Sequence, residues 1–426
     1  MRRPRKGRLS NHKIFPIEGY FNDMTEQLRR TWAQVNLDVV ADNFRYIKSI
    51  TKAKLCCVIK ADAYGHGAVH TAKKYEELGA DFFAVSNIEE ALQLRRSGIS
   101  LPVLILGYTP VCEAGVLAEY DISQCVYSSE YAGELSKAAE EAGVTVKIHV
   151  KIDTGMSRLG FYYQDINRDE SVVAEVAAVC RLAGLNPEGI FTHFAVADEG
   201  KSGDSFTMRQ YGCFKEMIES LLREDIDFQY RHCANSAAIL DFPLSHLDMV
   251  RAGIILYGLE PSNDVRHKGK IKPALELKSV ISHIKTVKAG ATVSYGRKFT
   301  ADRDIKIATV PIGYADGYSR ALSGGGAMLV HGRRCKILGR VCMDQLMIDL
   351  GDMDEVKIGD IVTVIGSDGN ESIYADELAE LLGTISYEVV CDIGARVPRV
   401  YLESGKEVAV LDYICPPENE SVIGSC

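Results

Sequence analysis

The 426-residue chain has no excess of basic residues and no long apolar run. Its 49 Lys and Arg residues are outnumbered by 58 Asp and Glu residues, so the formal net charge is −9 at pH 7. That balance offers no basic surface for a polyanion, and we expect no nucleic-acid partner. No apolar run is long enough to span a bilayer, and we expect no membrane partner either.

The chain also lacks the cysteine spacing of a disulfide scaffold or a zinc site. Its 12 cysteines are irregularly placed and none forms a Cys-x-x-Cys pair, so we expect no metal. Cysteines without a disulfide framework are typical of the reducing cytoplasm, where we expect this protein. The N-terminal stretch MRRPRKGR is basic but has no apolar core of signal-peptide length. We therefore expect residues 1–30 to be a flexible extension.

From residue 31 to about residue 270, short β-like runs alternate with amphipathic helical stretches such as 86–97 and 130–142. This alternation predicts parallel βαβ units. Eight runs fit a (β/α)8 TIM-type barrel, an α/β fold. A doubly wound sheet is the alternative, but no G-x-G-x-x-G follows any of the runs. The runs span residues 54–60, 81–87, 103–106, 124–127, 144–152, 189–193, 228–233 and 247–254.

After about residue 270 the pattern changes to β-like runs separated by glycine-rich turns, which predicts a mostly β second domain. Only residues 374–382 have a helical pattern. We therefore expect a barrel domain at 31–270, a β domain at 271–413 and a tail at 414–426. The β-like runs span residues 277–287, 305–311, 327–330, 347–350 and 361–365.

Lys60 stands at the end of the first apolar run, in VIKADAYGHG. An ammonium group is costly to bury, and a lysine held there can have a lowered pKa. Such a lysine can act as the nucleophile that forms a Schiff base. The alternative is a strand-end lysine whose amine reaches water.

Further polar residues fall at the predicted C-terminal ends of the strands, where TIM barrels place their active sites. Ser236 and the backbone near Gly253 would lie at the barrel's usual phosphate-binding corner. A lysine beside a phosphate corner suggests pyridoxal phosphate. The residues at these ends are Arg158, His193, Asn235, Ser236, Arg251 and Gly253.

Several segments in order make the chain similar to a known family. VIKADAYGHG, VSYGR and GYADGY are the most specific of them. From about residue 31 to about residue 413 the chain resembles the alanine racemases, fold-type III pyridoxal-phosphate enzymes. The other matching segments are TWAQVNLD, KIDTGMSRLG, THFAVAD, CANSAA, VRAGIILYG, GRVCMDQLMID and RVPR.

The resemblance implies racemisation of L-alanine and D-alanine by two bases on opposite faces of the substrate. Lys60 would bind the cofactor and act as the base on the D-face. Tyr295 would be the base on the L-face, contributed by the partner subunit, so a homodimer would share its active sites. The D-alanine would supply cell-wall peptidoglycan.

The resemblance also assigns the cofactor contacts. Arg251 would face the pyridine nitrogen, and His193 would orient Arg251 and Tyr295. The groups that would bind the phosphate are Tyr64, Ser236 and the backbone of Gly253 and Ile254.

The remaining implied roles concern the substrate. Arg158 and the backbone of Met343 would bind its carboxylate. Lys151 aligns with a lysine that is carbamylated in many members, and that modification would let it brace Arg158. Tyr314 and Asp344 would line the entrance.

One position departs from the family pattern. The family commonly has a tyrosine immediately before RVPR, where this chain has Ala395. The missing side chain would enlarge the pocket unless Arg396 refills it, so a serine/alanine or broader racemase is an alternative. A non-catalytic pyridoxal-phosphate carrier is another, although such carriers have no second domain to supply Tyr295. A decarboxylase of the same fold type would carry different motifs.

Overall fold

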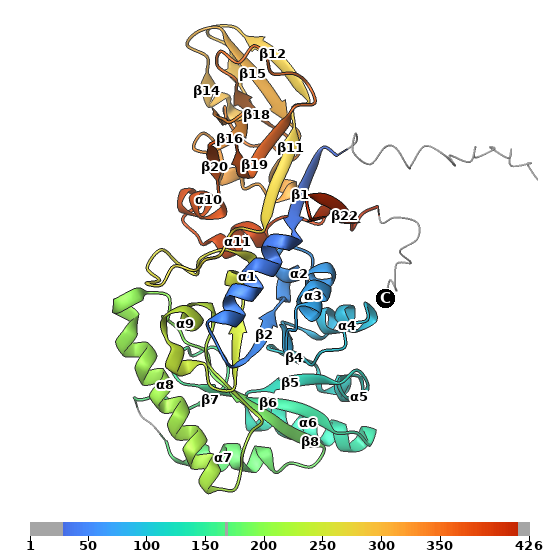
Figure 1. Cartoon of the computed structure of the whole chain (residues 1–426), viewed down its shortest axis with the longest axis vertical. Coiled ribbons are helices and arrows are strands. Elements are labelled where there is room, and N and C mark those ends of the chain that lie inside the picture. Colours follow the sequence, from blue (N-terminus) through green and yellow to red (C-terminus); the bar gives the residue numbers. More distant parts are fainter. Residues whose placement is uncertain (1–28, 167–168, 416–426) are drawn as a thin grey trace, which may run out of the picture.

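The computed structural model describes residues 29–166 and 169–415. The predicted extension at 1–30 and tail at 414–426 lie almost entirely outside these residues. Figure 1 shows a barrel of strands and helices joined to a second part made mostly of strands. This arrangement confirms the predicted fold class.

Eight parallel strands form the barrel, in the order β10-β2-β3-β4-β5-β6-β8-β9. Backbone hydrogen bonds bridge the two ends of this sheet: Asp248 N–H donates to Arg231 O at 3.1 Å, and Arg251 N–H to Ala234 O at 3.0 Å. Each of the eight predicted runs overlaps one of these strands. Their bounds are β2 Lys54–Val58, β3 Phe82–Val85, β4 Val103–Ile105, β5 Ile122–Val126, β6 Val146–Asp153, β8 Leu185–Phe191, β9 Tyr230–His232 and β10 Met249–Ala252.

Helices cover the outside of the barrel (Figure 1). The helix predicted at 86–97 is α4, where the Asn87 side chain caps the first turn by accepting from Glu90 N–H at 3.0 Å. The helix predicted at 130–142 is α6, which ends at Gly143 in the left-handed conformation. The helices are α1 Leu37–Ser49, α3 Ala68–Glu77, α4 Ile88–Arg96, α5 Ala114–Glu119, α6 Ser129–Ala142, α7 Ser171–Cys180, α8 Gly200–Arg223 and α9 Ser236–Asp241.

The second part is built on a sheet in the order β17-β16-β19-β11-β1-β21-β22, with β20 paired to β19. Its first strand, β1 (Thr31–Asn36), precedes the barrel in sequence and pairs with β11 and β21. The described part of the chain therefore starts in the second part, enters the barrel through α1 and returns. The other strands are β11 Leu275–Val280, β16 Ala327–Val330, β17 Arg333–Lys336, β19 Ile361–Asp368, β20 Glu371–Ile373, β21 Arg399–Glu403 and β22 Lys406–Leu411.

Two expectations for the second part are wrong. The run at 277–287 is two strands in different sheets, β11 and β12 (His283–Val287), and β12 pairs with β15 (Ile305–Val310), which pairs with β18 (Leu346–Asp349). The helix at 374–382 is α10 (Ala375–Leu382), but α11 (Ser386–Cys391) is a second helix. Six residues are too few to show a helical period.

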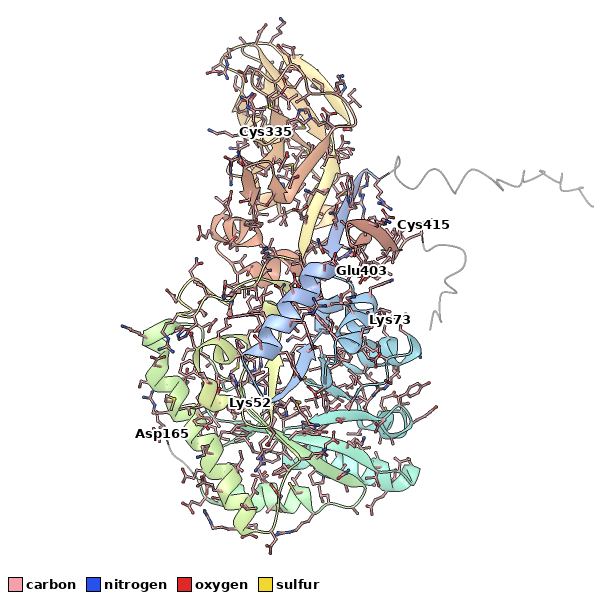
Figure 2. All side chains as sticks on the ribbon, viewed as in Figure 1. Lys52, Lys73, Asp165, Cys335, Glu403 and Cys415 are labelled. Carbon is pink, nitrogen blue, oxygen red and sulfur yellow. The ribbon has the colours of Figure 1, made fainter. Side chains whose placement is uncertain are left out.

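Helix α11 lies at the junction with the barrel (Figure 1). A Cβ at Gly65 would lie 2.1 Å from Val390 O, so this close approach requires glycine. Lys74 on α3 also joins the two parts through an ion pair with Glu403, and Figure 2 labels Glu403. Within residues 29–166 and 169–415, no helix is long and apolar enough to cross a bilayer and no cluster of metal-ligating side chains is present.

Candidate active site

A cavity of about 920 Å³ opens at the C-terminal ends of the barrel strands. Most of the residues that the sequence singled out meet here, as the barrel rule predicted. Helix α11 adds lining groups from the second part. The predicted residues in the lining are Lys60, Tyr64, Lys151, Arg158, His193, Asn235, Ser236, Arg251, Gly253 and Ile254.

Lys60 follows β2 and faces this cavity. Burial, and then the positive charge of Arg158, lower the pKa of its amine. The four residues after it, Ala61 to Tyr64, all have φ between +50° and +54°. A left-handed turn costs about 1–2 kcal/mol for each such residue. The contacts around this turn must therefore hold it in place.

Three groups that line the cavity lie close together and make a cradle. Gly253 N–H lies 3.0 Å from Ser236 Oγ, and a Cβ at Gly253 would lie 2.8 Å from Tyr64 Oη. Burial raises the pKa of Tyr64, so its phenol stays protonated and can donate a hydrogen bond. The cradle offers two hydroxyls and open backbone, which fits a phosphate group.

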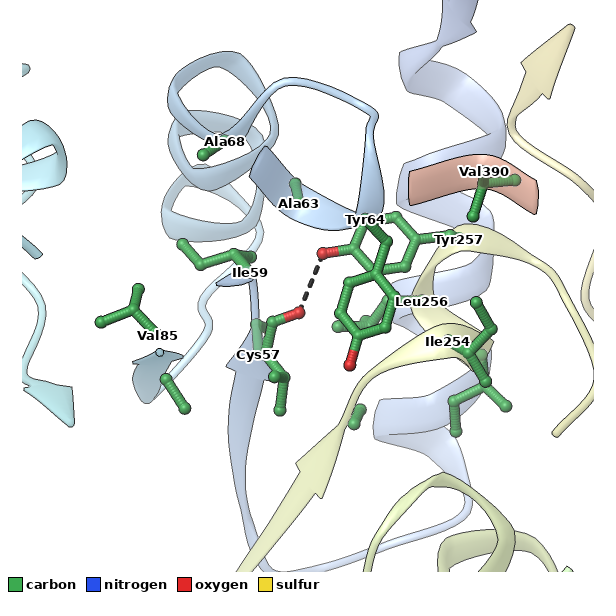
Figure 3. Packing of buried hydrophobic residues seen from close by; sticks show 14 of the residues in the cluster. Cys57, Ile59, Ala63, Tyr64, Ala68, Val85, Ile254, Leu256, Tyr257 and Val390 are labelled. Atoms are coloured by element: carbon green, nitrogen blue, oxygen red, sulfur yellow. Dashed lines mark hydrogen bonds between the residues drawn. The ribbon is translucent and has the colours of Figure 1, made fainter. Parts of the chain in front are cut away.

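The Tyr64 ring is held by its neighbours. Its centroid lies 5.0 Å from that of Tyr257 and 6.0 Å from that of Tyr387 on α11. Figure 3 shows Tyr64 and Tyr257 side by side, with the Tyr257 hydroxyl hydrogen-bonded to Val58 O at 2.9 Å. The phenol of Tyr64 is therefore positioned from both parts of the molecule.

Arg251, on β10, is buried and hydrogen-bonded on several sides. It donates to His232 Nδ1 at 2.9 Å, to Thr192 O at 2.7 Å and to His193 Nδ1 at 3.2 Å. Burial lowers its pKa to about 10, so it stays cationic near neutral pH. Burial, and then Arg251, hold the pKa of His193 well below its usual value, so this imidazole is neutral and accepts the hydrogen bond.

The chain of hydrogen bonds continues behind Arg251. Neutral His232 accepts from Arg251 at Nδ1 and so donates from Nε2 to His149 Nδ1, at 2.9 Å. His149 in turn donates from Nε2 to Glu188 Oε1, at 3.2 Å. Because burial lowers the pKa of both histidines, each tautomer is fixed by this direction of donation. This chain of hydrogen bonds was not predicted from the sequence, although strand alternation in β6 places His149 on the same face as Lys151.

Lys151 is buried on β6, and its amine donates to Ile152 O at 3.0 Å. Burial lowers its pKa to about 7. A substantial share of this amine is therefore neutral at physiological pH, which makes it nucleophilic.

A second cavity, of about 450 Å³, lies in the second part of the chain. Tyr295, Met343 and Asp344 line it, and the first two are among the most exposed large apolar residues, at 69% and 52%. Tyr314 is also exposed. Thus a single chain does not bring Tyr295, Met343 or Asp344 into the cavity that holds Lys60.

Ala395 is exposed and does not belong to the lining of either cavity. Its neighbour Arg396 forms ion pairs with Asp344 at 2.8 Å and Asp316 at 3.7 Å. Both ion pairs thus hold the Arg396 side chain against other residues of the second part. Whether the absence of a tyrosine enlarges the substrate pocket stays a prediction.

The lining groups on and beside α11 were not predicted from the sequence either. Thr384, Ile385, Tyr387, Glu388 and Cys391 face the Lys60 cavity. No strand-end rule points to them, because they approach from the second part. In the sequence, the only signal for the segment SYEVVC is that it lies shortly before RVPR.

Comparison with known proteins decides the family. Residues 35–261 match the family described as alanine racemase, N-terminal domain, and residues 274–401 match alanine racemase, C-terminal domain. The chain belongs to the alanine racemase family. An alanine racemase from Clostridium novyi is 43% identical over 92% of this chain and 100% of its own length. One from Methanococcus maripaludis is 45% identical over 87% of this chain and 98% of its own length.

Solved alanine racemase structures agree with the fold. The enzyme of Clostridium difficile 630 is 42% identical with a TM-score of 0.86, covering 91% of this chain and 100% of that one. The Bacillus anthracis enzyme with bound L-Ala-P is 40% identical with a TM-score of 0.84, covering 91% and 98%. Both parts of this chain are therefore shared with the family.

Proposed function

We propose that this protein interconverts L-alanine and D-alanine with pyridoxal phosphate as its cofactor. The observation that carries the proposal is the cavity where Lys60 and the cradle of Tyr64, Ser236 and Gly253 face the same space. The cofactor would require such a lysine and such a phosphate-binding group in one cavity. The enzyme would act in the cytoplasm, and its D-alanine would supply the synthesis of cell-wall peptidoglycan.

The residues fit the cofactor. When bound, pyridoxal phosphate supplies an aldehyde for the lysine and an electron sink for the substrate's Cα. The lowered pKa of Lys60 favours its neutral amine, which would bond to the cofactor and, once the substrate's amino group had replaced it there, would be free to hold a proton. Tyr64, Ser236 and the backbone of Gly253 and Ile254 would hold the phosphate. Arg251, fixed by His232 and His193, would present a permanent cation to the ring nitrogen.

The second base in the proposal is Tyr295 of a partner subunit. Racemisation requires one group to take a proton from one face of Cα and another group to deliver a proton to the opposite face. Tyr295 is exposed in a separate cavity, beside Met343 and Asp344, so it is available to a second copy. We therefore propose a homodimer in which each barrel receives Tyr295 and the Met343 backbone from its partner.

The substrate carboxylate would be bound by Arg158, which is exposed at the mouth of the cavity. Lys151 lines the same cavity, and its pKa of about 7 leaves neutral amine to react with CO₂. The resulting carbamate would carry a negative charge and brace Arg158. Tyr314 and Asp344 would border the entrance from the partner.

A second candidate is a racemase of broader specificity, with serine the first additional substrate. The observation that favours it is that Ala395 carries only a methyl group and Arg396 beside it is engaged by Asp344 and Asp316. Arg396 is therefore not free to replace the missing tyrosine.

The experiment is a racemisation assay on the purified protein with added pyridoxal phosphate. L-Alanine and L-serine are offered separately, and the product enantiomers are resolved. Wild type should form D-alanine, and Lys60→Ala should lose the activity without unfolding. Comparable turnover of serine would support the broader candidate. No turnover of either amino acid, with cofactor still bound, would favour a pyridoxal-phosphate carrier and contradict the proposal.

A further inference from the structure

The backbone that follows Lys60 turns left-handed for four residues, and none of them is glycine. The φ angles are +50° at Ala61, +54° at Asp62, +53° at Ala63 and +54° at Tyr64. L-residues avoid this region because Cβ crowds the following carbonyl oxygen. Strain of this kind persists only where surrounding contacts hold it. Because the turn begins at the residue after Lys60, the groups that hold it also set the direction of the lysine side chain.

Asp62, inside the turn, connects it to two other parts of the molecule. Its Oδ1 accepts a hydrogen bond of 2.8 Å from Ala68 N–H, at the start of α3. Its Oδ2 accepts a hydrogen bond from the hydroxyl of Tyr413, which lies just after β22. One half-buried carboxylate thus joins the turn to a barrel helix and to the second part.

The β21–β22 hairpin reaches the same segment at two more points. Arg399 Nε donates to Gly65 O at 3.0 Å, and the Tyr401 hydroxyl donates to His66 O at 3.1 Å. The Arg399 guanidinium also lies 5.5 Å from the centre of the Tyr413 ring. Arg399 is buried, so these contacts are fixed rather than shared with water. The β21–β22 hairpin and Tyr413 just after it therefore contact the turn that follows the lysine and the two residues after that turn.

The barrel also holds the turn. Glu90, on α4, accepts from Ala61 N–H and from Ser86 N–H, each at 2.7 Å. The first peptide of the turn is thus tied to the end of the neighbouring strand. With this end fixed, the position of the other end depends on Asp62 and on the hairpin.

Building on the proposed role of Lys60, we propose that Asp62 and Tyr413 are positioning residues for that lysine. Their hydrogen bond keeps the turn left-handed and aims the amine at the cofactor and the substrate. Neither residue lines the cavity, so both act through the backbone. The contact also makes the geometry of the lysine depend on the last strand of the second part.

The test compares variants of Asp62 and Tyr413 with matched controls. Tyr413→Phe removes the hydroxyl, Asp62→Ala removes the carboxylate, and Asp62→Asn keeps an acceptor and a side chain that tolerates left-handed φ. Tyr374→Phe is the control for the tyrosine, because its hydroxyl bonds only to Ser367 Oγ among the described contacts, at 2.9 Å. Asp38→Ala is the control for the aspartate, because it removes an acceptor for Ser404 N–H between the same two parts.

The measurements are kcat and KM for alanine, the absorption spectrum of the cofactor bound to Lys60, the rate at which the holoenzyme releases pyridoxal phosphate, and the melting temperature. We expect kcat to fall about tenfold in Tyr413→Phe and about a hundredfold in Asp62→Ala, since small misplacements of a reacting group have effects of this size. KM should stay within about twofold. Asp62→Asn should have most of the kcat that Asp62→Ala loses. Pyridoxal phosphate should be released faster from Tyr413→Phe and Asp62→Ala than from the controls.

The proposal is overturned if Tyr413→Phe and Asp62→Ala match their controls in kcat, spectrum and cofactor release, even where their melting temperatures drop. It is also overturned if Asp62→Asn is as slow as Asp62→Ala. If Asp62→Ala does not fold, Tyr413→Phe and Asp62→Asn decide the matter. A wild type that binds the cofactor but does not racemise alanine would contradict the proposed function, and the spectrum and release rates would still test the positioning.

Discussion

Lys60 and Tyr295 line two different cavities of one chain. Lys60 faces the cavity of about 920 Å³ at the mouth of the barrel, whereas Tyr295 faces that of about 450 Å³ in the second part. Under the proposed mechanism, each chain would present one half of a two-base site at each of two places. Two copies arranged head to tail would complete both sites.

This separation predicts complementation between inactive variants. Lys60→Ala and Tyr295→Ala should each lose at least about a hundredfold in kcat, the usual contribution of a positioned acid or base. When the two variants are dissociated, mixed and reassociated, hybrid dimers should regain activity, because one of their two sites has both bases. Hybrid dimers seen by mass spectrometry without recovered activity would contradict the shared site. Each variant reassociated alone is the control.

If the cradle binds the phosphate, a side chain at Gly253 should weaken the binding of pyridoxal phosphate. In Gly253→Ala the new Cβ would lie 2.8 Å from Tyr64 Oη, so the hydroxyl must move away from the phosphate. We expect the Kd for pyridoxal phosphate to rise at least about tenfold, which corresponds to about 1.4 kcal/mol. Gly115→Ala, where a Cβ would meet nothing within 4 Å, is the matched control. Equal affinities of the two variants in a spectroscopic titration would show that the cradle does not bind the phosphate.

His66 predicts a pH dependence of stability. Burial lowers its pKa to about 4 in the folded chain, whereas an unfolded histidine titrates near about 6.5. Between these values the unfolded chain binds a proton that the folded chain does not. The free energy of unfolding should therefore decrease as pH falls through this window, by up to about 1.4 kcal/mol per pH unit from this residue. The loss begins below about pH 6.5 and is complete near pH 4.

Denaturant unfolding at fixed protein concentration measures this dependence. His66→Gln should reduce the slope of the free energy of unfolding against pH, because glutamine does not titrate. The same slope in wild type and His66→Gln would show that other buried histidines, such as His149 and His232, account for the acid sensitivity.

Ala395 predicts a change in substrate preference when the family's tyrosine is restored. Ala395→Tyr should lower kcat/KM for serine relative to alanine by about tenfold, within the 1–3 kcal/mol that one pocket contact usually contributes. The ratio is measured with both amino acids on the same preparation. An unchanged ratio would mean that this position does not set the pocket's size.

The sequence predicted the barrel well because its strands are short apolar runs between amphipathic helices. It also placed Lys60, Ser236 and Arg251 in one cavity, since a parallel barrel brings its strand ends together. It could not place the Thr31–Asn36 strand, because alternation reveals a half-buried strand but not the sheet that it joins.

Other parts of the site leave no local signal. Tyr387 reaches the cavity from α11, whose six residues are too few to show a period. The left-handed turn after Lys60 is hidden as well, since KADAY contains no glycine to mark positive φ. Its conformation depends on Asp62, Tyr413 and Arg399, which meet only when the second part folds against the barrel.

The most direct test of two opposed bases is racemisation of L-alanine in deuterated water, with the α-hydrogen followed by mass spectrometry early in the reaction. If Lys60 and Tyr295 act on opposite faces, the D-alanine formed should carry solvent deuterium at Cα, because the group that delivers the proton is not the group that removed it. Unreacted L-alanine should gain deuterium more slowly than product appears. D-Alanine that keeps the hydrogen of its substrate would show that a single base transfers the proton and would contradict the account.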